Sequence, residues 1–411
     1  SCARDASVRS SGADGAVPGV TKVTFPGIDE LLDLAAGACG LGDFGSGFEP
    51  GLTVLVDAIR QDVAIHEGNV QTMCAQTLGL LISRAHSQEG WKRRPDCLRQ
   101  PIRAPVVVTG IPRTGTTALH KLLSIDPQFQ GLEQWLIGTP MPRPPRATWN
   151  DHPLYRAAVA SQEAFLQAVP SLRVAHEVNA DEVDECLNLL AQSFVSHYPS
   201  TGLGLPHYDR WWRTQDEASS YRRYADNLRL IGADSPGQRW LLKNPGHLTH
   251  LDALLDVFPD ACIIQTHRDP AKCIPSVCAL IWPVRNFFQG RQTDPALIGP
   301  RDLELWAWSA ERAQRVREAR PERFFDVRYT DFRRDPIAVV RAIYRHFGLA
   351  LSDETEQRMR QWLAGNPRDK HGQHEYQAER FGLSEAAIHE RFADYMKRHA
   401  LFETSKADVH G

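Results

Sequence analysis

Residues 109–117 combine the groups that a protein uses to bind an anion, namely small hydroxyl residues, glycines and one cation. Gly110 and Gly115 allow the backbone to come close to a ligand. An apolar run at 105–108 precedes the segment, and a helical pattern follows from Ala118. The first N–H groups of a helix and its dipole favour negative charge. The segment therefore predicts a strand, a loop that takes a phosphate or a sulfate, and a helix.

The loop differs from the usual nucleoside triphosphate loop in the place of its cation. It approximates the pattern G-x-x-x-x-G-K-[ST], but Thr116 stands at the lysine position. The lysine contact to the β- and γ-phosphates is therefore missing. The cation of this loop is Arg113.

A second cationic site follows the apolar run that begins at Cys262. Arg268 ends this predicted strand, and Ser276 comes eight residues later on a predicted helix. The turn between them can bring the hydroxyl back towards the guanidinium. A phosphomonoester carries about −1.5 to −2 charges near neutral pH, and a guanidinium binds it with two hydrogen bonds. The pair predicts a second phosphate site.

Together, the two sites resemble those of the sulfotransferases that use 3′-phosphoadenosine-5′-phosphosulfate (PAPS). Residues 112–117 are similar to the 5′-phosphosulfate loop P-[KR]-[ST]-G-[ST]-T of that family. Arg268 and Ser276 resemble the pair that grips the 3′-phosphate. The resemblance implies PAPS as cofactor, PAP as product, and sulfuryl transfer without a metal. The cofactor residues that it implies here are Arg113, Thr114, Gly115, Thr116, Thr117, Arg268 and Ser276.

Three further segments extend the resemblance, which runs from about residue 20 to about residue 395 and is closest to the bacterial branch of the family. Residues 240–247 resemble a strand and turn that carry a lysine beside the transferring group. Residues 326–331 resemble the [VL]-x-Y-[ED]-D segment of the family, and residues 366–383 resemble the segment that covers the cofactor. The resemblance implies site roles for Lys243, Tyr329, Arg368 and Lys370.

The general base is open at this stage. Relatives often carry a Trp-Glu pair after the loop, whereas this chain has Trp135–Leu136, and the nearest carboxylate is Glu133. An acidic segment that begins at His176 offers Glu182 as a second candidate. His247 follows the lysine turn and is expected to line the acceptor pocket. A general base must lie within hydrogen-bond distance of the acceptor's proton. Spacing in the sequence alone does not show which of these residues does so.

Two other functions remain possible on the sequence alone. A P-loop kinase or NTPase would need the lysine that Thr116 replaces. The other is a non-catalytic protein that binds PAP or another nucleotide. Lys243 argues against it, whereas Leu136, in the place of the family's glutamate, supports it. For a sulfotransferase, the expected acceptor is a hydroxyl or an amine of a small molecule, a phenol, a lipid or a glycolipid. Aromatic residues that could line an apolar pocket for it are Trp135, Trp211, Trp212, Phe287 and Phe288.

Composition narrows the class of protein. A net charge of −3 argues against general nucleic-acid binding. The sequence has no apolar run of about 18 residues that could span a membrane, and residues 1–18 read as a disordered tail without a signal peptide's apolar core. The eight cysteines include no C-x-x-C pair, so we expect a reduced, cytoplasmic protein. His247 and His250 lack a third ligand, so we expect no metal site.

The pattern along the chain predicts an α/β fold with a P-loop-like, mainly parallel sheet flanked by helices. A helical N-terminal region is expected at 19–100, with a glycine-rich loop at 40–47. The α/β core should span 101–349, with strands near Trp240, Ile263 and Phe324 and helical insertions between them. A helical, cofactor-covering segment is expected at 350–411. In a sheet of this kind the ligand binds at the carboxyl ends of the strands.

Overall fold

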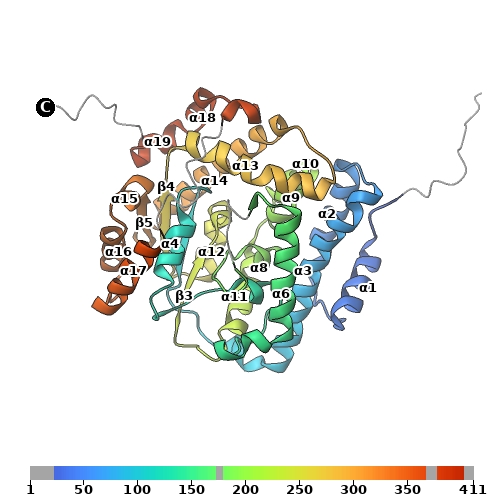
Figure 1. Ribbon diagram of the computed structural model, residues 1–411, viewed down its shortest axis with the longest axis horizontal. Coiled ribbons are helices and arrows are strands. Elements are labelled where there is room, and N and C mark those ends of the chain that lie inside the picture. The colour runs from blue at the N-terminus through green and yellow to red at the C-terminus, as the bar shows by residue number, and fades with distance from the viewer. Residues whose placement is uncertain (1–22, 173–178, 367–376, 402–411) are drawn as a thin grey trace, which may run out of the picture.

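A five-stranded, all-parallel sheet forms the centre of the molecule (Figure 1). The computed structural model describes residues 23–172, 179–366 and 377–401. The strands are β1 (Val106–Gly110), β2 (Phe129–Gln130), β3 (Arg239–Lys243), β4 (Cys262–His267) and β5 (Phe324–Arg328), in the order β2-β3-β1-β4-β5. The parallel α/β fold is therefore confirmed. The edge strand β2, with two residues, is too short for a pattern in the sequence to indicate.

The register of the sheet brings three strand ends together. Val108 of β1 pairs with Lys243 of β3, and Gly110 pairs with Thr266 of β4. The Thr109 hydroxyl also donates to the carbonyl of Asn244, just after β3, at 2.9 Å. The loops that leave β1, β3 and β4 therefore start side by side at the carboxyl edge.

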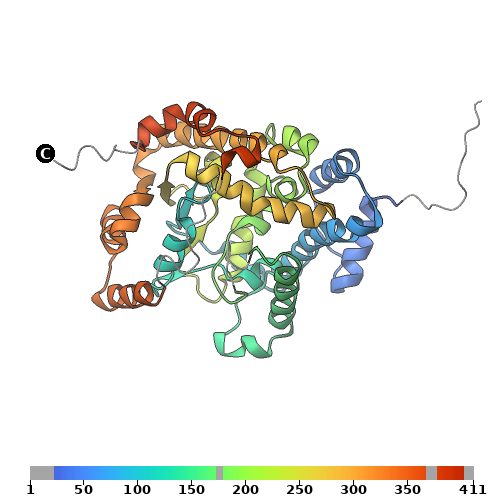
Figure 2. The ribbon, with the colours of Figure 1, turned by 45° about the horizontal axis from the view of Figure 1, so that its top comes forward.

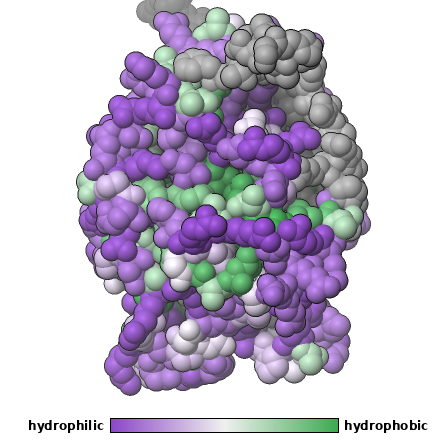
Figure 3. Space-filling model, turned by 90° about the vertical axis from the view of Figure 1, so that its left-hand side faces the viewer, coloured by the Kyte–Doolittle hydropathy of each residue, from purple (hydrophilic) through white to green (hydrophobic). Residues whose placement is uncertain are grey.

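Both faces of the sheet are covered, which explains why its strands read as continuous apolar runs. Val106 and Val108 belong to the apolar core on one face, whereas Val107 belongs to the core on the other. The first face packs against α4 (Thr116–Leu123), α16 (Pro336–His346) and α17 (Asp353–Gly365). In the space-filling view of Figure 3, this side of the molecule is mostly hydrophilic, with a hydrophobic band across its middle.

The second face carries a much larger core that also includes the N-terminal helices. Leu31 and Leu52 from that region are buried in the same apolar cluster as Val107 and Ile263 of the sheet. The helices around this cluster are α1 (Ile28–Cys39), α2 (Glu49–Asp62), α3 (Glu67–Arg93), α8 (Leu187–Ala191), α11 (Ala218–Ile231), α12 (Leu251–Val257) and α14 (Gly299–Ala319). The predicted N-terminal helices and the loop between α1 and α2 are present.

The remaining helices lie around the carboxyl edge of the sheet or at the periphery of the molecule. They are α5 (Gln134–Gly138), α6 (Pro153–Ala168), α9 (Tyr198–Leu203), α10 (Pro206–Trp212), α13 (Pro270–Gln289), α15 (Tyr329–Arg334), α18 (Glu385–Arg391) and α19 (Ala393–His399). Short 3₁₀ turns are η1 (Pro95–Arg99), η2 (Arg146–Asp151), η3 (Pro245–His250), η4 (Pro295–Leu297), η5 (Pro321–Arg323) and η6 (Ala378–Phe381). Helix α6 has no buried residue and projects from the body with η2 (Figure 2).

Candidate active site

The loop after β1 requires its two glycines for steric reasons. A Cβ atom on Gly110 would lie 2.4 Å from the Thr266 hydroxyl and 2.5 Å from the Thr266 carbonyl oxygen. Gly115 caps the N-terminus of α4 with φ of 94°, in the left-handed region. A Cβ on Gly115 would also press against the Tyr329 ring at 3.1 Å. The backbone N–H groups that open α4 are thereby kept close to β4 and to Tyr329.

Arg113 holds a strained backbone conformation, with φ of 71°. A non-glycine residue in this region costs on the order of 1–3 kcal/mol, and such strain concentrates at ligand sites. The loop is held by the Thr114 hydroxyl, which donates to the carbonyl of Ile111 at 2.7 Å and lies 2.5 Å from the Thr266 hydroxyl. The strain falls on the residue predicted to meet the anion.

The two predicted phosphate sites are joined by direct contacts. Arg113 Nε donates to the Ser276 hydroxyl at 3.1 Å. Arg268 Nη1 donates to the main-chain carbonyl of Arg113 at 3.1 Å, and its guanidinium lies 4.3 Å above the centre of the Tyr329 ring. Residues from the loop, the turn after β4, α13 and α15 therefore form one cationic cluster.

Lys243 ends β3 with its side chain 1% exposed. Its ammonium lies 2.8 Å from Glu185 Oε1 and 3.9 Å from Asp184 Oδ1. The backbone N–H of Cys186 donates to the Lys243 carbonyl at 3.1 Å. Because a buried charge is costly without a partner, the carboxylates stabilise the ammonium in its buried place. Sequence reasoning did not single out Glu185, although the acidic segment that offered Glu182 contains it.

The two predicted base candidates each form an ion pair. Glu182 accepts from Lys121 Nζ at 3.0 Å and from the backbone N–H of Asn179 at 3.0 Å. Glu133 accepts from Arg143 Nε at 3.0 Å. The residue before Asp184, Val183, forms a β-bridge with Glu133. These contacts hold the acidic segment against the loop after β2.

Two buried histidines lie near the carboxyl edge. His247, on η3, is 0% exposed, and its Nδ1 lies 2.9 Å from the Tyr221 hydroxyl. Burial lowers the pKa of His247 to about 3, so the ring is neutral. His120 of α4 was not predicted. Burial, with a further contribution from the charge of Lys243, lowers the pKa of His120 to about 3.

A model of the sulfotransferase family matches residues 105–353, which is more than half of the chain. The chain belongs to the sulfotransferase family. This family consists of enzymes that transfer sulfuryl groups, and the assignment favours that chemistry over a P-loop kinase or NTPase.

Solved sulfotransferases resemble the whole fold. Sulfotransferase STF1 of Mycobacterium tuberculosis H37Rv is 38% identical, with a TM-score of 0.81 over 90% of this chain and 99% of that one. Sulfotransferase STF9 of Mycobacterium avium is 30% identical, with a TM-score of 0.83 over 92% and 98%. A relative found by sequence is the omega-hydroxy-beta-dihydromenaquinone-9 sulfotransferase Stf3 of Mycobacterium bovis. It is 26% identical over 274 residues, which are 63% of this chain and 66% of that protein.

The other predicted site residues of this sulfotransferase fall into three groups. Thr116 and Thr117 open α4, the helix that the sequence predicts after the loop. His176, Arg368 and Lys370 lie outside the described residues. Of the aromatic candidates, Trp135 and Trp212 are buried in the apolar core, whereas Trp211, Phe287 and Phe288 are partly buried. No helix in the described ranges has the length and apolar character of a membrane span.

Proposed function

We propose that this chain transfers a sulfuryl group from PAPS to a hydroxyl group of an apolar, lipid-like acceptor. The observation that carries the proposal is the joined cationic cluster of Arg113, Ser276 and Arg268. A nucleotide with anionic groups at both its 5′ and 3′ ends matches two linked cationic sites, one of them at a helix N-terminus. A nucleoside triphosphate would make no use of the second site.

We propose that the residues from 111 to 117 hold the 5′-phosphosulfate, with Arg113 as the cation. Arg268 and Ser276 would hold the 3′-phosphate, and Tyr329 would support Arg268 through the stacking seen in the structure. Arg368 and Lys370 are proposed to add charge to the same site, as the family resemblance implies. Donors of this kind are preorganised, which is the main source of electrostatic catalysis.

Lys243 and Glu185 are proposed as the pair beside the reacting atoms. When bound, PAPS supplies a sulfur whose bond to the bridging oxygen breaks as the acceptor oxygen bonds to it. Lys243 would stabilise the charge that develops on the bridging oxygen, together with Arg113. Glu185 would accept the acceptor's proton through its carboxylate. We prefer Glu185 to Glu133 or Glu182, because it alone of the three contacts Lys243 in the described structure.

An apolar acceptor is supported by aromatic side chains on α6 and α13. Phe165 of α6 and Phe287 of α13 lie edge to face with ring centres 5.5 Å apart. Phe288 packs beside Phe287 at 5.3 Å, and all three rings are partly exposed. The name of Stf3 gives a menaquinone-derived lipid as that relative's acceptor. His247 is proposed as a neutral polar group in the wall between acceptor and core.

The proposal is tested by incubating the protein with sulfur-labelled PAPS and two acceptors, a long-chain isoprenoid alcohol and a small phenol. We expect label in the isoprenoid product and little in the phenol. Phosphate-labelled ATP in a parallel reaction tests the kinase alternative, which transfer from ATP would support. PAP binding with no transfer to either acceptor would instead support a non-catalytic protein. Lys243→Met is the matched control, because it keeps an unbranched side chain without the charge.

A further inference from the structure

The two residues that flank Arg268 are each held by the C-terminal helices. His267 is 0% exposed and Asp269 is the N-cap of α13. His267 contacts α19, and Asp269 contacts α18. Both helices are distant in sequence from the predicted cofactor loop; α18 packs against α13 and α14, and α19 packs against α18. The 3′-phosphate site is therefore supported from a part of the chain outside the proposed reaction machinery.

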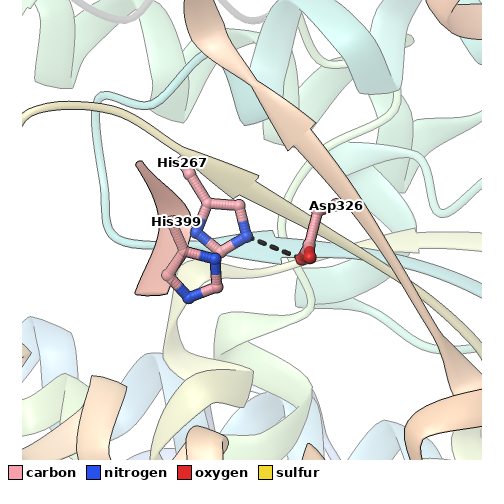
Figure 4. Close-up of side chains that lie close together, drawn as sticks. All are labelled: His267, Asp326 and His399. Atoms are coloured by element: carbon pink, nitrogen blue, oxygen red, sulfur yellow. Dashed lines mark hydrogen bonds and ion pairs between the residues drawn. The ribbon is translucent and has the colours of Figure 1, made fainter. Parts of the chain in front are cut away.

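The first contact is a directed chain of hydrogen bonds through His267. Its Nε2 lies 2.8 Å from Asp326 Oδ1, and its Nδ1 lies 2.9 Å from the Tyr395 hydroxyl. Burial lowers the pKa of His267 and raises the pKa of Tyr395 well above its ordinary value. A carboxylate only accepts, so Nε2–H donates to Asp326, and Nδ1 accepts from the Tyr395 hydroxyl. His399 stacks on the His267 ring at 3.7 Å (Figure 4).

In this cluster of two imidazoles and a carboxylate, His267 and Asp326 already bind protein groups. Arg317 donates to both oxygens of Asp326, at 2.6 Å each. Although burial opposes it, hydrogen bonds from His267 and Arg317 hold the pKa of Asp326 at about 2. Both nitrogens of His267 are also engaged. The arrangement therefore serves to fix the ring of His267 rather than to collect ligands for a metal.

The second contact fixes the start of α13. Asp269 Oδ1 accepts from the backbone N–H of Ala271 at 2.9 Å and from His389 Nε2 at 2.9 Å. The first bond is the N-cap of the helix that carries Ser276. His389 thus ties α18 to the cap that orients this helix.

We infer that Tyr395 and His389 are positioning residues for the 3′-phosphate site. Tyr395 fixes the last residue of β4, His389 fixes the first turn of α13, and Arg268 lies between these two fixed points. The inference rests on the proposed function, because it assumes that Arg268 and Ser276 bind the 3′-phosphate of the nucleotide. It assigns the C-terminal helices a role in nucleotide selectivity.

The test measures the binding of PAP and of AMP by calorimetry, and takes the ratio of their dissociation constants as the contribution of the 3′-phosphate. Tyr395→Phe removes only the hydroxyl. His389→Leu removes the donor to Asp269, and His389→Gln restores an N–H near the same place. Arg391→Met is the matched control, because Arg391 ties α18 to Glu304 and Glu311 on α14 without contacting either flanking residue.

We expect Tyr395→Phe and His389→Leu to lower the preference for PAP by about three- to tenfold, the effect of one lost hydrogen bond. AMP binding should change little, His389→Gln should recover the preference, and Arg391→Met should keep it. Equal losses for PAP and AMP, or an unchanged ratio in both variants, would overturn the inference while leaving the proposed function intact. A wild-type protein that binds PAP and AMP equally would refute the 3′-phosphate site itself, and the inference with it. Because His389 is partly exposed, its variants test the idea even if Tyr395→Phe folds poorly.

Discussion

Replacing Lys243 by methionine tests the proposed transition-state role most directly. If the ammonium stabilises charge only as the sulfur–oxygen bond breaks, its loss should cost about 2.7–4 kcal/mol in turnover, or about 10²–10³-fold, with little change in PAP affinity. The structure adds a further expectation, because the ammonium lies 2.8 Å from Glu185 and 3.9 Å from Asp184. Without it, the Glu185 carboxylate loses the cation that it contacts, so the variant should also be less stable.

A double-mutant cycle separates these effects. Glu185→Gln removes one carboxylate, so the double variant with Lys243→Met should recover part of the lost stability while turnover stays low. Single-turnover sulfuryl transfer from labelled PAPS gives the rate, calorimetry gives PAP affinity, and urea unfolding gives the stability. Lys243→Arg should recover only part of the rate, since its charge is more diffuse. An unchanged rate in Lys243→Met, or a PAP affinity that falls as much as the rate, would refute the reasoning.

Three further outcomes are expected. Arg113→Ala should lower turnover and PAP affinity together, because the same guanidinium meets the anion before and during transfer. The far-ultraviolet dichroism spectrum should stay unchanged. Wild-type activity in this variant would show that the loop does not bind the phosphosulfate. Burial raises the pKa of Glu217 from about 4.5 to about 8. Between these pH values the folded state keeps a proton that the unfolded state loses. The free energy of unfolding should therefore fall as pH rises through that range, by up to about 1.4 kcal/mol per pH unit. Urea unfolding across this range should show a flatter profile for Glu217→Gln, and identical profiles would contradict the assignment. Gly110→Ala should lower the free energy of unfolding by about 1–3 kcal/mol, because the added carbon would collide with Thr266. Gly79→Ala should fold normally, since no further atom lies within 4 Å of its added carbon. Equal thermal midpoints for the two variants would contradict the steric argument.

Local patterns in the sequence predicted the centre of the fold well. The strand, loop and helix from 106 to 123 follow from short-range chemistry, since glycines, an apolar run and a helical pattern act over a few residues. The same holds for the strands that end in Lys243 and at His267, where apolar runs stop at a polar turn.

Long-range packing decided what the sequence left open. Glu185 rather than Glu182 meets Lys243, because the segment is held by a bridge between Val183 and Glu133 and by the N–H of Cys186 bonding to the Lys243 carbonyl. These contacts join residues that are about 50 positions apart, so spacing within the segment did not indicate them. The support of Arg268 by α18 and α19 has the same origin, because it spans more than 100 residues.

If PAPS binds as proposed, the hydrogen bond from Arg268 to the carbonyl of Arg113 would link recognition at one end of the nucleotide to geometry at the other. A phosphate that fixes Arg268 would then also help to keep Arg113 in its strained, left-handed conformation. Binding energy from a remote part of the donor would in this way be used where the bond breaks. A donor that lacks the remote phosphate would react slowly even at saturating concentration, rather than only binding less tightly.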